Sequence, residues 1–335
     1  MSQNRPFLRH PMAKWGLFMV ALVALWFGAW LTFAWWLDGK LGEATTRLAK
    51  RGITIDCADR SVVGFPFRGG IACSDLSIDD RIHDFQLTSG PLRSAAQLYD
   101  PFKSVVEFDG PLMFSRLGFD LRADWQHMRL FFEAARGGFE RTSLTYRQLD
   151  GDIQGRSFAA TKGALHVRPT PQAAVDLDIA GTVDLVQFAS TGFDPVNVAI
   201  DARLKDGYRD FIISRRAPVS WLRDGGNTTF RNLALTLPDG GVVAAMGDLL
   251  VNPDGTLSGE MKIGAQDIEK VAQWVAEINP EFGPMVAALG QGIAMLGKSH
   301  TIAGREMEAI TVTIVGGEAR VDFIQLGRIP PIPLQ

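Results

Sequence analysis

The 335-residue sequence predicts a mainly β protein, in which a single N-terminal transmembrane helix precedes a long antiparallel β meander, either a curved sheet or a sandwich. Three observations predict this fold class. One long uncharged apolar run stands near the N-terminus. Apolar and polar residues alternate with a period of two over most of the remaining chain. Two apolar stripes at helical spacing, near residues 267–296, predict a C-terminal helical hairpin packed on the sheet.

The apolar run covers residues 15–37 and contains no charged side chain. At about 1.5 Å per residue, a helix of this length spans the roughly 30 Å hydrocarbon layer of a bilayer. Trp15 at one end and Trp35–Trp36 at the other suit the two membrane–water interfaces. Basic residues precede the run and acidic residues follow it. This favours a single-pass protein of the bacterial inner membrane, with residues 1–14 in the cytoplasm and the main body in the periplasm.

A cleaved signal peptide is the alternative to this anchor. The apolar region of a signal peptide is about 7–15 residues long and ends at a small-x-small cleavage site. The present run is longer and ends in the bulky sequence AWWLDG. The sequence therefore predicts an uncleaved signal-anchor, followed by a juxtamembrane helical stalk over residues 38–52 in which leucines recur at helical spacing.

Residues 53–327 form the predicted periplasmic β-rich domain. Alternation of apolar and polar residues marks strands at 175–179, 196–204, 233–237 and 310–314, and Asp-Gly pairs between such runs favour tight turns. Segment 91–101 is predicted as a short helix between strands. The proline-rich tail, 328–335, cannot continue a central strand, so we expect it to pack in extended form on the sheet edge or to bind a partner.

The only two cysteines are Cys57 and Cys73. The runs ITIDC and GIAC place them on matching faces of two strands, with the turn Gly64–Phe67 between. We predict a disulfide that staples a hairpin, since an exported domain permits disulfides. The spacing fits neither a C-x-x-C redox pair nor a metal site. Phe65 and Phe67 are interpreted as core anchors of this hairpin, with a tip that contacts lipid or a partner as the alternative.

Two stretches that follow the apolar helix carry a family resemblance. They are GITIDCADRSVVGFPFRGGIACSDL, residues 52–76, and SGPLRSAAQLYDPFKSVVEFDGPL, residues 89–112. With them the chain resembles, over nearly its whole length, the bacterial family called domain of unknown function 2125, which implies no catalytic residues. Residues 247–275 are loosely similar to the AsmA-like envelope proteins, a group associated with outer-membrane assembly and lipid movement across the periplasm.

Composition and motifs argue against catalysis and nucleic-acid binding. The formal net charge is −3, whereas a nucleic-acid partner requires a basic face. The chain contains no H-E-x-x-H, G-x-S-x-G or P-loop motif. We therefore expect a non-enzymatic protein with no cofactor and no metal.

Two functions fit these patterns. In the first, the sheet exposes an apolar face that binds or passes phospholipid; in the second, helices close the sheet and the protein is an anchored scaffold or assembly factor for an envelope protein complex. Inward-facing residues look alike in both cases. The candidate contacts with lipid or a protein partner are Phe65, Phe67, Arg68, Leu177, Ile179, Val198 and Leu235.

Overall fold

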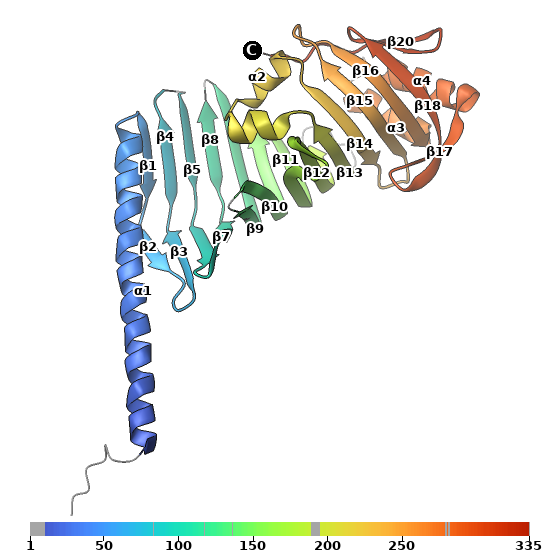
Figure 1. Cartoon of the computed structure of the whole chain (residues 1–335). Coiled ribbons are helices and arrows are strands. Elements are labelled where there is room, and N and C mark those ends of the chain that lie inside the picture. Colours follow the sequence, from blue (N-terminus) through green and yellow to red (C-terminus); the bar gives the residue numbers. More distant parts are fainter. Residues whose placement is uncertain are drawn as a thin grey trace, which may run out of the picture.

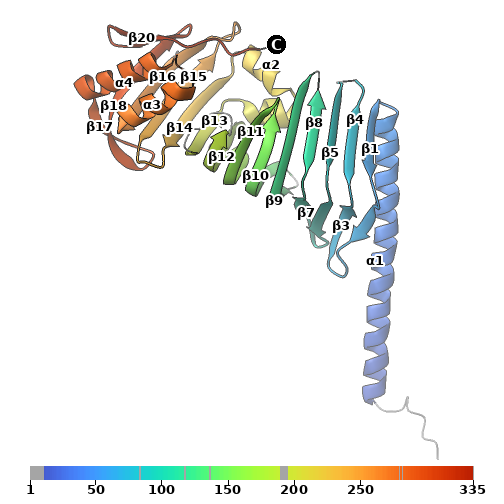
Figure 2. The same cartoon turned by 180° about the vertical axis from the view of Figure 1, so that it is seen from behind.

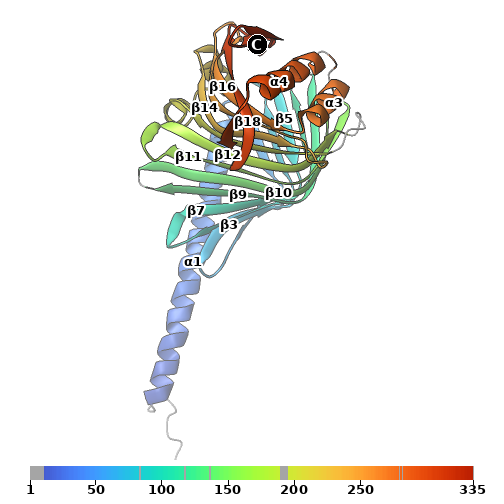
Figure 3. The same cartoon turned by 90° about the vertical axis from the view of Figure 1, so that its right-hand side faces the viewer.

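The computed structural model describes residues 11–82, 84–116, 118–135, 137–188, 195–278, 280 and 282–334. Over these residues it contains one 20-stranded antiparallel sheet, a long N-terminal helix and shorter helices toward the C-terminus. The sheet is curved and twisted, so that strands beside the N-terminal helix and strands at the far end run in different directions (Figures 1 and 3). The predicted mainly β fold class is confirmed.

The helical elements are α1 (Pro11–Ala49), the π-helix η2 (Tyr208–Ile213), α2 (Pro218–Arg223), α3 (Ile268–Ile278) and α4 (Gly283–Leu296). The strands before the centre of the sheet are β1 (Ile53–Cys57), β2 (Ser61–Val63), β3 (Arg68–Cys73), β4 (Leu76–Asp80), β5 (Phe85–Ser89), β6 (Leu92–Gln97), β7 (Asp100–Phe108) and β8 (Leu112–Arg116). The central strands are β9 (Phe119–Ala135), β10 (Gly138–Ile153), β11 (Arg156–Thr170), β12 (Ala173–Phe188), β13 (Val196–Leu204) and β14 (Asn227–Thr236). The last strands are β15 (Val242–Val251), β16 (Leu257–Gln266), β17 (Lys298–Ile302), β18 (Arg305–Val315), β19 (Glu318–Val321) and β20 (Ile324–Arg328).

The centre of the sheet is a meander in which each strand from β9 to β16 pairs with the next. Toward the N-terminus the sheet divides into two half-sheets that lie side by side along β9. The half-sheet β1–β4–β5–β8 pairs with the first part of β9, and the half-sheet β2–β3–β6–β7 pairs with its second part. The long strand β9 therefore joins the two half-sheets.

Helix α1 continues without a break from the apolar run into the predicted stalk. It is the one helix among the described residues that is long and apolar enough to cross a membrane. Its N-terminal part projects beyond the sheet, whereas its C-terminal part lies along β1 and β2 (Figure 1). Of the predicted cytoplasmic segment 1–14, residues 1–10 lie outside the described residues.

The cysteine hairpin differs from its prediction. The structure brings the Cys57 and Cys73 sulfur atoms within bonding distance, with the Cα atoms 5.3 Å apart. However, β1 pairs with β4, and β3 pairs with the additional strand β2. The reason is that residues 61–63, which lie between the ITIDC run and the predicted turn, are extended and supply a closer partner for β3. The cysteine pair therefore links the two half-sheets.

Segment 91–101 is not the predicted helix. Residues 92–97 form β6, which pairs with β3 on one side and with β7 on the other. The Leu-Arg-Ser-Ala-Ala-Gln sequence has reasonable helix propensity, but propensity is a weak preference that tertiary pairing overrides. The predicted strands at 175–179, 196–204 and 310–314 lie within β12, β13 and β18. The predicted strand at 233–237 lies in β14, except for Leu237, which directly follows that strand.

The C-terminal helices α3 and α4 cover the sheet between β13 and β18 (Figure 2). One core cluster joins Ile293 of α4 to Met261, Ile310 and Val312 of the sheet. Another joins Val271 of α3 to Val196 and Leu237. The tail runs back along the sheet, where the Ile329 and Ile332 amides donate to the Gly317 and Gly255 carbonyls.

Candidate functional site

One face of the central sheet is apolar over many neighbouring strands. Side chains alternate across a strand, so the pairing register shows which residues share a face. Three rows of paired residues define what we call the apolar face. They are Val106–Leu130–Leu144–Leu165–Gly181–Ile200–Leu233, then Met128–Tyr146–Gly163–Val183–Val198–Leu235, and finally Phe132–Thr142–Val167–Ile179–Ala202–Phe230. Strands far apart in sequence thus contribute to a single surface.

This apolar face is open over β9–β11 and covered further along. Phe132 and Leu165 are 40% and 41% exposed. On β13 and β14, in contrast, Val198 and Leu235 pack against Val271 of α3 and its neighbours. Near the start of β12, Leu177 is 4% exposed, because the loop that leads into η2 packs over it. The face is therefore an open apolar strip that runs beneath helices at its far end.

At its near end the apolar face reaches α1. The row that contains Phe132 continues through Ser104 and Ala96 to Gly69 of β3. A Cβ at Gly69 would lie 2.7 Å from the Phe33 ring of α1, so only a glycine allows the helix to lie this close to β3. The apolar face thus extends from the apolar helix α1 to the helices at the C-terminal end.

The opposite face of the same strands, here called the polar face, is charged. Its basic residues are Arg93, Lys103, Arg129, Arg141, Arg147, Lys162, Arg168, Arg203 and Arg231, and its acidic residues are Glu107, Glu133, Asp178, Asp184 and Asp201. On this part of the polar face, basic side chains thus outnumber carboxylates, although the net charge of the chain is negative. Most carboxylates are paired, for example Glu107 with Arg129 at 2.7 Å.

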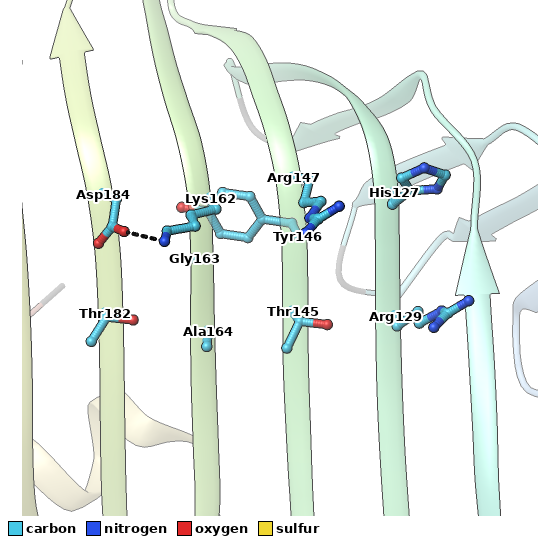
Figure 4. Close-up of a pocket in the computed structure, with 10 residues that line it drawn as sticks. All are labelled: His127, Arg129, Thr145, Tyr146, Arg147, Lys162, Gly163, Ala164, Thr182 and Asp184. Atoms are coloured by element: carbon cyan, nitrogen blue, oxygen red, sulfur yellow. Dashed lines mark ion pairs between the residues drawn. The ribbon is translucent and has the colours of Figure 1, made fainter.

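A cavity of about 830 Å³ lies between β9 and β12, and most of its lining side chains belong to the polar face (Figure 4). Lys162 and Asp184 form an ion pair of 3.1 Å at its edge. The Tyr146 ring lies over Gly163, where a Cβ would come within 2.5 Å of the ring. Burial, and to a smaller extent the negative charge of Asp184, raise the pKa of the Tyr146 phenol.

The most buried charge on the polar face is Asp178, 5% exposed. It accepts hydrogen bonds from Thr170 at 2.8 Å, Arg231 at 2.9 Å and Arg203 at 3.3 Å. Burial opposes its ionisation, but these three donors outweigh that effect and hold the pKa of the carboxyl below its usual value. The network ties β11, β12, β13 and β14 together.

The structure separates the candidate contact residues into two places. Ile179, Leu177, Val198 and Leu235 lie on the apolar face, the last three under or beside helices. Phe65, Phe67 and Arg68 lie at the β2–β3 turn. Phe65 and Phe67 are 46% and 61% exposed and contact α1 instead of anchoring a sheet core.

Sequence reasoning missed the open centre of the apolar face, which includes Phe132, Leu144 and Leu165. Alternation within β9–β11 is the signal that could have identified these residues. Among the described residues there is no group of three or more His, Cys, Asp or Glu side chains placed to hold a metal ion.

Comparison with known proteins places the chain in a family. No curated protein and no solved structure gives a significant match. The family described as "Uncharacterized protein conserved in bacteria (DUF2125)" matches residues 30–330, which include the last part of the apolar run, the whole sheet and the C-terminal helices. The chain therefore belongs to the bacterial family of domain of unknown function 2125.

Proposed function

We propose that this protein is a non-enzymatic envelope protein, anchored in the inner membrane, whose apolar sheet face binds phospholipid acyl chains or passes them along the periplasmic domain. One observation carries the proposal: the face of the sheet that begins against Phe33 of the apolar helix becomes the open apolar strip over β9–β11 and leads on to β14. Large apolar patches exposed to water are unusual in soluble proteins and mark sites of interaction. An acyl chain that leaves a bilayer beside α1 would meet mainly apolar and small side chains along this path.

Leu165→Glu is expected to abolish phospholipid co-purification with the full-length protein. Leu165 lies in the centre of the open strip and is 41% exposed, so a carboxylate there stays hydrated while it makes contact with acyl chains unfavourable. We expect a stability loss within about 1 kcal/mol, as for other partly exposed positions. Native mass spectrometry of the detergent-extracted protein measures bound lipid, and circular dichroism measures stability.

The matched control is Ala164→Glu. Ala164 is the neighbouring residue of the same strand, but it lies on the polar face between Thr145 and Thr182. This variant should keep its lipid. Wild-type protein that carries no phospholipid, or equal lipid in both variants, would reject the proposal. Leu177 and Leu235 are less informative test positions, because helical segments cover them and a charge there would disturb packing.

The alternative function is an anchored scaffold or assembly factor for an envelope protein complex. It is favoured by the covered half of the sheet, where α3 and α4 close the apolar face with side chains such as Val271 and Ile293. The polar face would then offer its basic residues to an acidic partner protein. Under this alternative, Ala164→Glu, which changes the charge of the polar face, would be the disruptive substitution of the pair.

The proposed topology predicts the behaviour of fusion proteins. An alkaline phosphatase joined after residue 52, which folds only in the periplasm, should be active, because the cations precede the apolar helix. Mass spectrometry of the mature protein should find an N-terminus near residue 1. An inactive fusion would mean that the orientation is the reverse of the proposed one. A new N-terminus near Asp38 would mean that the helix is a cleaved signal peptide.

A further inference from the structure

The β2–β3 turn, residues 64–67, packs against the middle of α1. The Phe65 ring centroid lies 5.4 Å from that of Phe27 and 5.5 Å from that of Trp30. The Phe67 ring lies 6.0 Å from Trp26. These contacts fall within residues 15–37, the same segment that is apolar enough to cross a membrane. The turn therefore reaches a level of the helix that a bilayer would surround.

The depth of the turn follows from helix geometry. If the hydrocarbon layer begins near Trp15, just beyond Lys14, its roughly 30 Å thickness ends about 20 residues later. Trp26 and Trp30 then lie about 16 Å and 22 Å along this path, that is about 8–14 Å inside the hydrocarbon boundary nearest the sheet. The bilayer cannot shift far toward the N-terminus, because Lys14 and the earlier cations would enter it.

The hydrogen bonds of the turn fit an apolar surrounding. Irregular backbone is tolerated at membrane depth only where its polar groups are satisfied by protein. The Trp26 indole N–H donates to the Pro66 carbonyl at 3.1 Å, and the Trp30 indole N–H donates to the Arg68 carbonyl at 3.2 Å. The Phe67 carbonyl accepts from the Leu98 amide at 3.0 Å. Three successive carbonyl positions around the tip are thus paired within the protein.

A second turn accompanies the first. The Leu98 amide that binds the Phe67 carbonyl begins the β6–β7 turn, in which Tyr99 is 77% exposed. Phe102, at the start of β7, is 48% exposed. These exposed aromatic side chains thus belong to a turn that is hydrogen-bonded to the turn of Phe65 and Phe67. Arg68 stands next to Phe67, and its long side chain can extend its guanidinium toward phospholipid headgroups.

We infer that the β2–β3 and β6–β7 turns form a wedge inserted into the membrane leaflet nearest the sheet, where Phe65, Phe67 and Tyr99 contact phospholipid acyl chains. The wedge is a second membrane contact of the chain besides α1. It also places Gly69, the first residue of the apolar face, at the level of the leaflet. This inference is based on the contacts of the turn with α1. It does not require that lipid moves along the apolar face.

Spin labels on full-length protein in phosphatidylcholine–phosphatidylglycerol vesicles test the wedge. Single cysteines replace Phe67, Tyr99, Leu25 on the exposed side of α1, and Arg156 at a turn between β10 and β11. The described structure leaves no other free thiol. Collision with oxygen and with a water-soluble nickel complex is measured for each label. Oxygen concentrates in hydrocarbon and the nickel complex is excluded from it, whereas burial in protein lowers both collision rates.

We expect the labels at Phe67 and Tyr99 to resemble the label at Leu25, with collision with the nickel complex at least about tenfold below that at Arg156, since a polar solute is costly to transfer into hydrocarbon. Tyr99→Cys removes no packing, so its result is informative even if Phe67→Cys disturbs the turn. If only the label at Phe67 is shielded from the nickel complex and it collides frequently with oxygen, the result would still support insertion of the β2–β3 turn. Labels at both positions as accessible to nickel as Arg156 would overturn the inference, whatever the lipid content of the apolar face.

Discussion

Cys57→Ser should lower the free energy of unfolding by about 2–5 kcal/mol. The pair closes a loop with 15 residues between the cysteines, and it links the end of β1 to the end of β3, which do not pair with each other. Without it, the two half-sheets are joined at this edge by the short chain connections β1–β2 and β3–β4 and by backbone hydrogen bonds between them, such as that from the Ser74 amide to the Ala58 carbonyl. Denaturant unfolding of the detergent-solubilised protein, followed by circular dichroism, measures the change.

The double variant Cys57→Ser, Cys73→Ser is the control for this prediction. If the effect comes from the cross-link, the free energy of unfolding of the double variant should be only slightly lower than that of the single variant. The small difference is the cost of a serine hydroxyl at position 73, where Cys73 is 5% exposed. Cys57 is the better single position because it is only half-buried. Two free thiols in non-reduced wild-type protein would contradict the prediction directly.

Asp178→Asn should destabilise the protein by about 2–3 kcal/mol. Removal of one partner from a fully buried ion pair costs roughly 3–5 kcal/mol, and a smaller value is expected here because a third or more of each arginine side chain is exposed to water. The substitution leaves Arg168, Arg203 and Arg231 close together with no central carboxylate. Arg231 retains its ion pair with Asp201, which limits the loss.

The same network predicts a pH dependence. The folded-state pKa of Asp178 lies below its unfolded value, so its contribution is fully present above about pH 4 and is lost as pH falls through the folded-state pKa. The stability difference between wild type and Asp178→Asn should therefore be constant from pH 5 to 8 and shrink in acid. Asp152→Asn, near the end of β10 and outside this network, is a control carboxylate. A difference that grows in acid would contradict this assignment of Asp178.

The sequence predicts the strands well, because alternation in segments such as 196–204 is a local property of half-buried antiparallel strands. It does not predict which strands pair. β3 pairs with the neighbouring strand β2 on one side and with β6, which begins only after β4 and β5, on the other, and this choice depends on contacts that local patterns do not show. The helix expected at 91–101 is wrong for the same reason, since pairing on both sides holds residues 92–97 extended.

The functional surface is harder to predict than the strands. In the first part of β9 the apolar residues Leu121, Ala123 and Trp125 lie on one face. In its second part Met128, Leu130 and Phe132 lie on the other face. A reading of the sequence sees two short alternating runs and cannot tell which one is covered. Leu165 and Leu235 have similar local patterns, yet one is exposed and the other packs beside α3. Exposure depends on where distant helices dock.

Each strand of the sheet pairs with strands that are close to it in the sequence, and this governs the order in which the sheet can form. Over the described residues, no strand pairs with a partner more than three strands away in the sequence. Each newly synthesised segment can therefore add to the edge left by the previous ones without waiting for the C-terminus, and loop closure costs little over such short separations. Helix α1 lies over the first edge from the start, so that only the growing edge offers unpaired backbone to other chains. A sheet of twenty strands can thus assemble in the direction in which the chain is synthesised.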